Sequence, residues 1–251
     1  MNEDLLNDIK HLLQWYRLNY GDEIALSEDF SLNLSIEEEE PAPAVPQAVP
    51  PAVETDVPSA DTAKIHGHHP KLKAFYEQIR DCKQCDLAKS RKHFVFGMGN
   101  PDADIMFVGE APGRDEDEQG FPFVGRAGKL LNKMLFALSM KREDIYIANV
   151  LKCRPPGNRD PLPDEVLQCE PYLKQQIEII RPRVMVALGR IAGQVLLRSE
   201  ASLKQLREST HRYNGIPCIV TYHPAALLRN SGWKAAAWQD LKKIKSIMDD
   251  V

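Results

Sequence analysis

Residues 104–113 of the chain read DIMFVGEAPG, an apolar run that ends in a turn bounded by glycines. The run from 104 to 109 shows no alternation of polar and apolar residues, which is the pattern of a strand buried on both faces. Runs of the same kind recur at 145–150 (IYIANV), 184–189 (VMVALG) and 216–222 (IPCIVTY). Helical patterns occupy 125–139, 163–180, 191–206 and 233–248. This alternation predicts an α/β fold, a three-layer α/β/α sandwich around a central parallel sheet of about four strands.

The composition is that of a soluble globular protein, since the 251 residues are 43% hydrophobic and 27% charged. No run approaches the ~18 apolar residues of a membrane span. The acidic start MNEDLLNDIK also lacks the basic and apolar segments of a secretory signal. We therefore expect a cytoplasmic monomer with no membrane partner. In a reducing cytosol its five cysteines favour metal binding or redox chemistry over disulfides.

The charge is distributed unevenly along the chain. Residues 1–65 carry fourteen acidic and three basic side chains, whereas residues 66–251 carry twenty-two acidic and twenty-nine basic ones. The second part is therefore cationic, as a domain that binds a polyanion would be. Many cytosolic domains are mildly basic as well, so charge alone leaves a nucleic-acid partner open.

Three segments follow from the same division. Residues 1–35 form an acidic arm whose apolar residues recur at helical spacing, which predicts a short amphipathic helix. Residues 36–65 form a Pro/Ala-rich acidic linker that we expect to be disordered, because proline fixes φ and removes backbone donors. Residues 66–251 form the folded domain. The arm would dock on this domain, on a partner protein, or on nothing stable.

Three polar side chains follow predicted strands at the point where each strand ends. Glu110 follows the first strand, Asn149 ends the second, and His223 follows the fourth. Because ligands bind at the carboxyl ends of the strands in an open α/β sheet, we expect these side chains at one rim. Each alone is more commonly a turn or structural residue, and their convergence is what favours a site.

The glycine and acidic motifs near the first strand exclude some other functions. Gly109-x-x-x-Gly113 lacks the Lys-Ser/Thr of a phosphate-binding loop, and Gly97-x-Gly99 precedes its strand, whereas a dinucleotide fingerprint follows one. The acidic run 115–118 is expected to be a solvated loop rather than a divalent-metal site. Phe121 and Phe123 precede a helix, where either ring packs against that helix or forms a floor on which a base stacks.

The cysteines fall into two separated pairs and a fifth residue. Cys82-x2-Cys85 and Cys153-x15-Cys169 are spaced for tetrahedral zinc or for a four-iron, four-sulfur cluster, and spacing alone does not choose between them. Thioredoxin-like chemistry is disfavoured, because the tight pair precedes the first strand. Cys218, inside the last predicted strand, is expected to be a small core residue.

Several long motifs in one order resemble a known family. CKQC, GEAPGRDEDEQGFPFVGRAG, NVLKCRPPGNRDP and HPAALLRN occur between about residues 70 and 248. The chain resembles the family 4, iron–sulfur uracil-DNA glycosylases, which hydrolyse the N-glycosidic bond of uracil in DNA for base excision repair. The resemblance implies the uracil-glycosylase form of the sandwich and a uracil-containing DNA partner, single- or double-stranded.

The resemblance also assigns roles to residues. It implies a structural 4Fe–4S cluster on Cys82, Cys85, Cys153 and Cys169. Uracil would contact Glu110, Ala111, Phe123, Asn149 and His223, of which Glu110 and His223 serve catalysis. In the best-known members of the superfamily the first motif carries an aspartate as the base; here Ala111 and Pro112 leave Glu110 as its only acid, so a true base role stays open.

Chemistry agrees with these assignments. An Asn149 amide held in one orientation forms hydrogen bonds with N3–H and O4 of uracil, whereas cytosine presents the reverse pattern of donor and acceptor. A donor from His223 stabilises negative charge at uracil O2. The residues after His223 that are candidates for a wedge into the DNA stack are Leu227, Leu228 and Arg229. Two other functions are weighed against the glycosylase: a non-catalytic polymerase-associated DNA-binding protein, and an iron–sulfur redox protein.

Overall fold

A computed structural model describes residues 69–250 of the chain. The chain divides into two units, Met1–Ser59 and Ala60–Val251, and every described residue lies in the second. The expected arm (1–35) and linker (36–65) lie outside the described residues. No helix of the described part is both long enough and apolar enough to cross a membrane.

A mixed six-stranded sheet forms the centre of this unit, in the order β1-β3-β2-β4-β6-β5. The strands are β1 (Met98–Gly99), β2 (Ile105–Gly109), β3 (Tyr146–Asn149), β4 (Val184–Leu188), β5 (His211–Tyr213) and β6 (Ile216–Thr221). The four central strands are parallel, whereas β1 and β5 pair antiparallel at the two edges. The four predicted strands are these four central ones, so the expected parallel sheet is confirmed, with two edge strands added.

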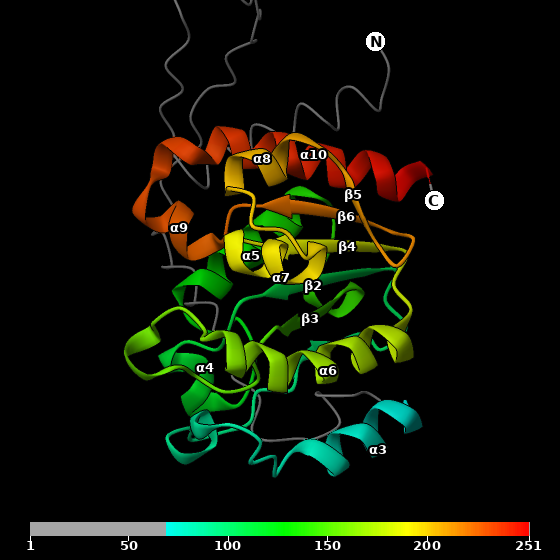
Figure 1. The fold of residues 1–251 in the computed structure, drawn as a ribbon. Helices are drawn as coiled ribbons and strands as arrows, with labels where there is room; N and C mark the ends of the chain where they lie inside the picture. Colours follow the sequence, from blue (N-terminus) through cyan, green and yellow to red (C-terminus); the bar gives the residue numbers. More distant parts are fainter. Residues whose placement is uncertain (1–68, 251) are drawn as a thin grey trace, which may run out of the picture. The chain divides into compact units, whose positions relative to one another are not determined.

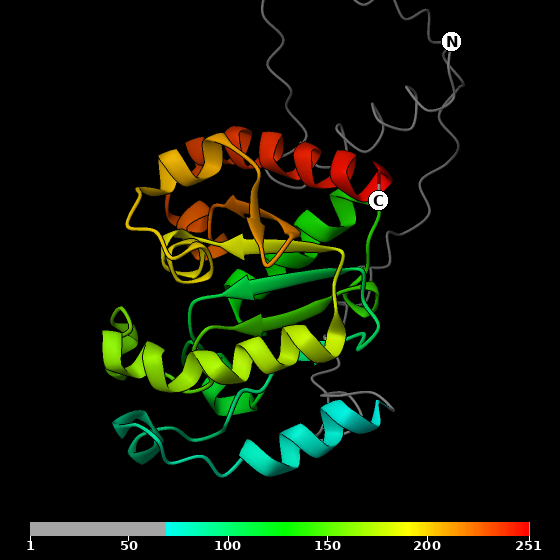
Figure 2. The ribbon, with the colours of Figure 1, turned by 45° about the vertical axis from the view of Figure 1, so that its right-hand side comes forward.

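Helices cover both faces of the sheet, as Figures 1 and 2 show. One face packs against α3 (Pro70–Ile79), α6 (Pro163–Ile180), α7 (Arg190–Leu197) and α8 (Leu203–Glu208). The other packs against α5 (Arg126–Ala137), α9 (Pro224–Arg229) and α10 (Lys234–Asp250). The remaining helical segments are α4 (Arg114–Gln119), η1 (Asp86–Lys89), η2 (Arg142–Asp144), η3 (Pro156–Asn158) and η4 (Ser231–Trp233). The predicted three-layer α/β/α sandwich is confirmed.

The central strands supply both halves of the core. In β2, Met106 and Val108 belong to the apolar cluster on the α6 side, and Ile105 and Phe107 belong to the cluster on the α5 side. All four are at most 1% exposed. Because successive side chains of a strand point to opposite faces, a strand covered on both faces must be apolar throughout. This requirement explains the unbroken run at 104–109.

The expected single helix at 191–206 is wrong, because two helices occupy this stretch. The helix α7 ends at Leu197, and Arg198 follows in the left-handed conformation with φ 51°. Ser202 then begins α8 as its N-cap, accepting a hydrogen bond from the main-chain N–H of Gln205. A capping serine and a left-handed residue are ordinary helix boundaries, and here they interrupt an apolar pattern that is helical on both sides.

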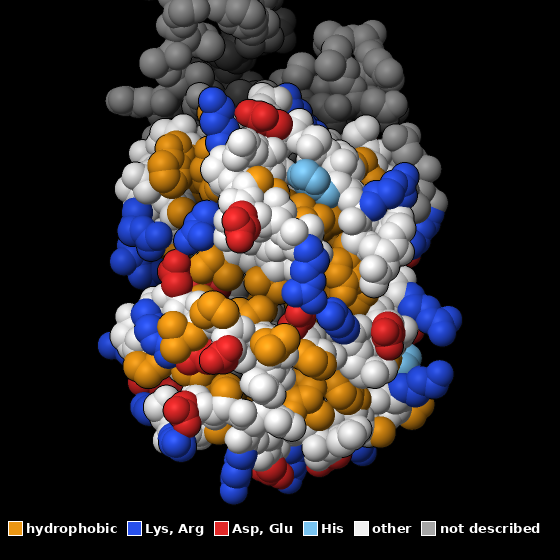
Figure 3. Space-filling view, in the orientation of Figure 1, with side chains coloured by type: hydrophobic (Ala, Val, Ile, Leu, Met, Phe, Trp, Pro, Cys, Tyr) orange, Lys and Arg blue, Asp and Glu red, His pale blue; other side chains and the backbone are white. Residues whose placement is uncertain are grey.

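The outer surface of the α6 layer carries exposed apolar side chains. On the face shown in Figure 3, apolar side chains gather over α6 and α3 in the lower half of the view. Leu167, on α6, is 66% exposed. The same helix carries Cys169 on its buried side.

Candidate active site

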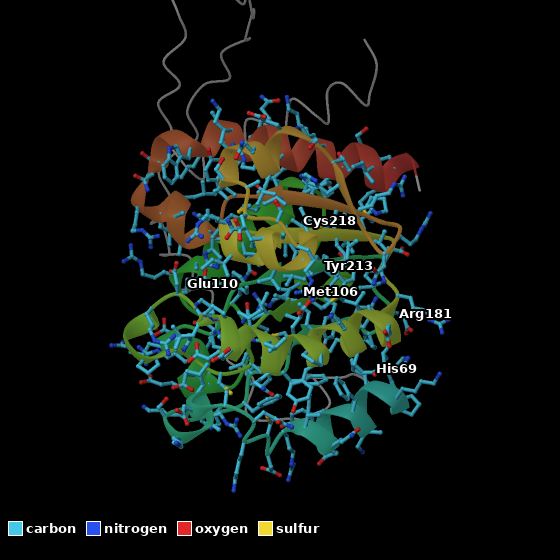
Figure 4. The ribbon with its side chains drawn as sticks, viewed as in Figure 1. His69, Met106, Glu110, Arg181, Tyr213 and Cys218 are labelled. Carbon is cyan, nitrogen blue, oxygen red and sulfur yellow. The ribbon has the colours of Figure 1, made fainter. Side chains whose placement is uncertain are left out.

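A cavity of about 350 Å³ opens at the carboxyl ends of the parallel strands. Figure 4 shows Glu110 at this end of the sheet, opposite Arg181, which precedes β4. The five residues expected at the uracil site all line the cavity: Glu110, Ala111, Phe123, Asn149 and His223. Cavities of this size are typical of small-molecule sites. The topology therefore brings together residues that are up to 113 positions apart in the chain.

Asn149 and Phe123 meet over Gly109, the last residue of β2. Gly109 pairs in register with Asn149 of the neighbouring strand β3. A Cβ atom at Gly109 would lie 2.3 Å from Asn149 Oδ1 and 2.8 Å from Phe123 Cε2. The missing side chain of Gly109 thus creates the space that the amide and the ring share.

The amide of Asn149 has an unused acceptor. Asn149 is 2% exposed, and its Oδ1 is one of two buried side-chain polar atoms in the described residues that have no hydrogen-bond partner. Buried acceptors are nearly always paired, because leaving one unpaired costs ~1–3 kcal/mol. An unpaired acceptor that lines a cavity indicates a ligand that brings a hydrogen-bond donor.

The loop that carries Phe123 is held rigidly. Phe123 adopts a left-handed conformation with φ 54°, which is strained for an aromatic residue. The Arg142 guanidinium donates 3.0 Å to the Phe123 carbonyl and also donates to the carbonyl of Pro122. Glu116 accepts from the main-chain N–H groups of the two residues after Phe123. These contacts fix the ring against the cavity, where it is 5% exposed.

His223 enters the site as a neutral donor. It is the N-cap of α9, and its Nδ1 accepts a hydrogen bond of 3.1 Å from the main-chain N–H of Ala225. Burial and the nearby Arg229 lower the pKa of His223 to about 4. At neutral pH the ring is therefore uncharged and carries its proton on Nε2. The ring centroid lies 5.4 Å from that of Phe123, so the two rings border the same slot.

Glu110 is a carboxyl group whose ionisation is opposed by its surroundings. Burial, together with the nearby Asp160 carboxylate, raises the pKa of Glu110 to about 7, and Arg190 partly offsets this rise. Arg190 also binds Asp160 directly, at 3.0 Å. A carboxyl group with a pKa near the working pH, in a cavity, is typical of catalytic sites.

Two further residues line the cavity that the sequence did not single out, Arg159 and Asp160. Both lie at the end of the motif NVLKCRPPGNRDP, between η3 and α6. The signal available was their place in that motif, because no strand end or helical period marks the loop.

The expectation that the acidic run 115–118 is a solvated loop is wrong. These residues form most of α4, and Asp117 is 3% exposed. Asp117 accepts a hydrogen bond of 2.9 Å from the main-chain N–H of Lys92, and Glu116 fixes the Phe123 loop. Acidic residues in the first turn also suit the positive end of a helix dipole. Glu116 therefore holds the loop that carries Phe123, and Asp117 holds the main chain at Lys92.

Of the three wedge candidates, Leu227 is not placed to enter DNA. It faces inward from α9 and is 2% exposed in the α5-side core. Leu228 is 41% exposed, and Arg229 is exposed and lines the cavity. Successive side chains of a helix are turned by about 100°, so Leu228 can be exposed while Leu227 is buried.

The four paired cysteines line a second, small cavity. Cys82 and Cys85 come from the loop after α3, Cys153 follows β3, and Cys169 lies in α6. Cys218 is fully buried within β6, as expected of a core residue. Figure 4 shows Cys218 on that strand, within the sheet.

Three of these sulfur atoms receive hydrogen bonds from nearby donors. Arg91 Nη1 lies 3.2 Å from Cys153 Sγ, the Lys152 main-chain N lies 3.3 Å from Cys169 Sγ, and Tyr172 donates to Cys82 Sγ at 3.2 Å. No group of three or more His, Cys, Asp or Glu side chains in residues 69–250 is arranged to hold a metal ion. The sulfur atoms thus border a common space without converging on one ion.

Comparison with known sequences assigns this fold and site to a class. The sequence model described as "Uracil DNA glycosylase superfamily" matches residues 96–242, which include the four central strands. The chain is 46% identical over 175 residues to the type-4 uracil-DNA glycosylase of Archaeoglobus fulgidus, covering 66% of this chain and 88% of the relative. It is 44% identical over 181 residues to that of Saccharolobus solfataricus, covering 68% and 84%.

A bacterial relative is as similar. The chain is 43% identical over 176 residues to the type-4 uracil-DNA glycosylase of Thermotoga maritima, covering 68% of this chain and 92% of the relative. The chain belongs to the type-4 uracil-DNA glycosylase family. The family resemblance inferred from the four motifs is confirmed.

Proposed function

We propose that this protein removes uracil from DNA by hydrolysing its N-glycosidic bond, which leaves an abasic site for base excision repair. The observation that carries the proposal is Asn149, which lines the cavity and whose buried Oδ1 has no hydrogen-bond partner in the described residues. A flat ring in the slot beside Phe123 would bring its edge to this amide. Uracil supplies the missing hydrogen-bond donor through its N3–H.

The Asn149 amide also explains selection against cytosine. With Oδ1 accepting from N3–H, the amide nitrogen donates to O4 of uracil. Cytosine presents a bare N3 and an amino group at these positions, so acceptor meets acceptor and donor meets donor. Each buried group left unpaired costs ~1–3 kcal/mol, so the two unpaired groups together give roughly 30-fold discrimination or more.

His223 acts on the departing base. Cleavage of the glycosidic bond leaves an oxocarbenium-like sugar and moves negative charge onto uracil, including its O2. The Nε2–H of a neutral His223 donates to O2 and stabilises this charge as it develops. Because Nδ1 already accepts from the main chain, the ring is held in the tautomer that this step needs.

Glu110 acts on the sugar side. As a carboxylate it orients the attacking water and stabilises the sugar cation electrostatically. Its raised pKa of about 7 means that the active, ionised form grows as the pH rises. Asp160 also lines the cavity, where its charge is partly offset by the ion pair with Arg190.

The target nucleotide must leave the DNA stack before it reaches the cavity, at a cost of a few kcal/mol. Leu228 and Arg229 stand at the exposed end of α9, where they would fill the gap left by the everted base. Single-stranded or weakly paired uracil lacks most of this cost and should be excised faster.

The four cysteines are proposed to hold a 4Fe–4S cluster. The fit rests on four thiols around one cavity and on N–H and O–H groups that donate to three of their sulfur atoms, contacts that stabilise a thiolate. Such a cluster braces the loops that meet there and takes no part in glycosidic cleavage. Its ligands would be Cys82, Cys85, Cys153 and Cys169.

The proposal is tested with single-turnover excision from a uracil-containing oligonucleotide, followed by alkaline cleavage at the abasic site. Asn149→Ala and His223→Ala should each lower the rate by about 10² or more, the effect of losing one oriented group. His211→Ala, a histidine at the far sheet edge in β5, is the matched control and should not. Near-normal rates for both site variants, with circular dichroism unchanged, would remove the assignment.

A further inference from the structure

A buried lysine beside the active site has no part in the mechanism above. Lys152 is 0% exposed, and its Nζ lies 2.9 Å from the main-chain oxygen of Asn149 and 2.5 Å from Gln176 Oε1. A charged amine in the interior is costly, and an apolar side chain of similar volume would fill the same space without that cost. The contacts of the amine therefore need an explanation other than packing.

The acceptor Gln176 is itself held in one orientation. Its Nε2 donates to the main-chain oxygen of Phe96 at 2.9 Å and lies 3.4 Å from Tyr146 Oη. Its Oε1 is consequently turned toward Lys152. The amine of Lys152 is thus fixed from one side by α6 and delivers its other hydrogen bond to Asn149.

The main chain of Lys152 is anchored to the cysteine site. Its N–H donates to Cys169 Sγ at 3.3 Å, its carbonyl accepts from the Val95 N–H at 2.9 Å, and the next residue is Cys153. One residue therefore contacts the four-cysteine cavity through its backbone and the uracil-reading residue through its side chain.

The main-chain carbonyl of Asn149 connects the Lys152 side chain to the Asn149 amide. The next two residues are bonded to the first motif: Val150 N–H donates to Gly109 O and Leu151 N–H to Glu110 O. Lys152 binds the Asn149 carbonyl that lies between the strand and this turn. No hydrogen bond in the described residues holds Oδ1, so the direction of the amide depends on its packing beside Phe123 and on the main chain from which it projects.

We propose that Lys152 is a positioning residue, which aims the Asn149 amide by holding its main-chain carbonyl and thereby connects the four-cysteine site to uracil recognition. The inference rests on the proposed function. It predicts that Lys152 contributes to excision only while the Asn149 amide is present.

A double-mutant cycle tests this dependence with the cofactor-loaded, full-length protein. Single-turnover rates are measured for the unmodified protein, Lys152→Met, Asn149→Ala and the double variant. Lys152→Met should lower the rate by about tenfold or more when Asn149 is present, and by less than about twofold when it is alanine. Equal losses in both backgrounds would overturn the inference, because a merely structural role is additive.

Three further measurements keep the test decisive. If Lys152→Met does not fold, judged by circular dichroism and iron content, the same cycle is run with Lys152→Gln, which is neutral but polar. Lys204→Met, at an exposed lysine of α8, is the matched control, and its effect should be small both with and without the Asn149 amide. Affinity for an uncleavable 2′-fluoro-uracil strand should fall with Lys152→Met in parallel with the rate, and unchanged affinity would overturn the inference. Absence of excision by the unmodified protein would instead refute the proposed function itself.

Discussion

Gly109→Ala should close the slot in which the base is read, while leaving the sheet intact. The added Cβ would lie 2.3 Å from Asn149 Oδ1 and 2.8 Å and 2.9 Å from two carbons of the Phe123 ring. Cβ atoms essentially never approach other heavy atoms closer than 3.0 Å, so the amide must move by about 0.7 Å or more. Displacement of a binding group by about 1 Å costs roughly 10²-fold in rate, or about 2.7 kcal/mol of transition-state stabilisation.

The same overlap should lower the free energy of unfolding by ~1–3 kcal/mol, the usual cost of overpacking, which leaves the protein folded. Excision under single turnover and thermal unfolding by circular dichroism separate these two effects. Gly232→Ala is the control, since a Cβ there meets nothing within 4 Å. If the Gly109→Ala variant excised uracil at the normal rate, the base would not be read beside Gly109. The arrangement proposed for the slot would then be abandoned.

Four other outcomes are expected. Excision should increase as the pH rises through about 7, because burial raises the pKa of Glu110 to about 7 and only the carboxylate acts; Glu110→Gln should abolish the increase, and a flat pH–rate profile for the unmodified protein would contradict it. Cys153→Ser should lose the visible absorbance and bound iron while Cys218→Ala keeps both, since Cys218 lies in the sheet core; equal iron content in the two variants would contradict the ligand set. Leu228→Ala should slow excision from duplex DNA more than from single strands, and an equal effect on both would remove the wedge role. Deletion of residues 1–65 should leave excision of naked DNA unchanged, and a large loss would show that this segment belongs to the catalytic unit.

The elements that could be predicted from the sequence are those with an unbroken pattern. The central strands must be apolar on both faces, so each is visible as a run such as 104–109. The edge strand β1 has two residues and β5 has three, which is too short for any period to appear. The boundary between α7 and α8 could not be predicted from the helical period, because apolar residues at helical spacing lie on both sides of it; the left-handed Arg198 and the capping Ser202 divide the two helices.

The candidate site could be predicted in part, for a topological reason. Parallel strands end at one rim, so Asn149 and His223 could be placed together without coordinates. Contacts between two particular residues that lie far apart in the sequence could not be predicted. The hydrogen bond between Lys152 and Gln176 is one of these. Nor does sequence distinguish the buried Leu227 from its exposed neighbour, since both are leucines on a six-residue helix.

The positions of the four cysteines along the chain bear on how the protein matures. Cys82 and Cys85 leave the ribosome long before Cys169, which lies on a helix that must first dock against the strands. Because nascent domains fold as their segments emerge, the cluster proposed for these cysteines would be completed only after α6 has been made. A substitution that loosens α6 would therefore yield chains with a formed sheet and a poorly loaded cofactor, a defect that supplying more iron to the cell would not correct.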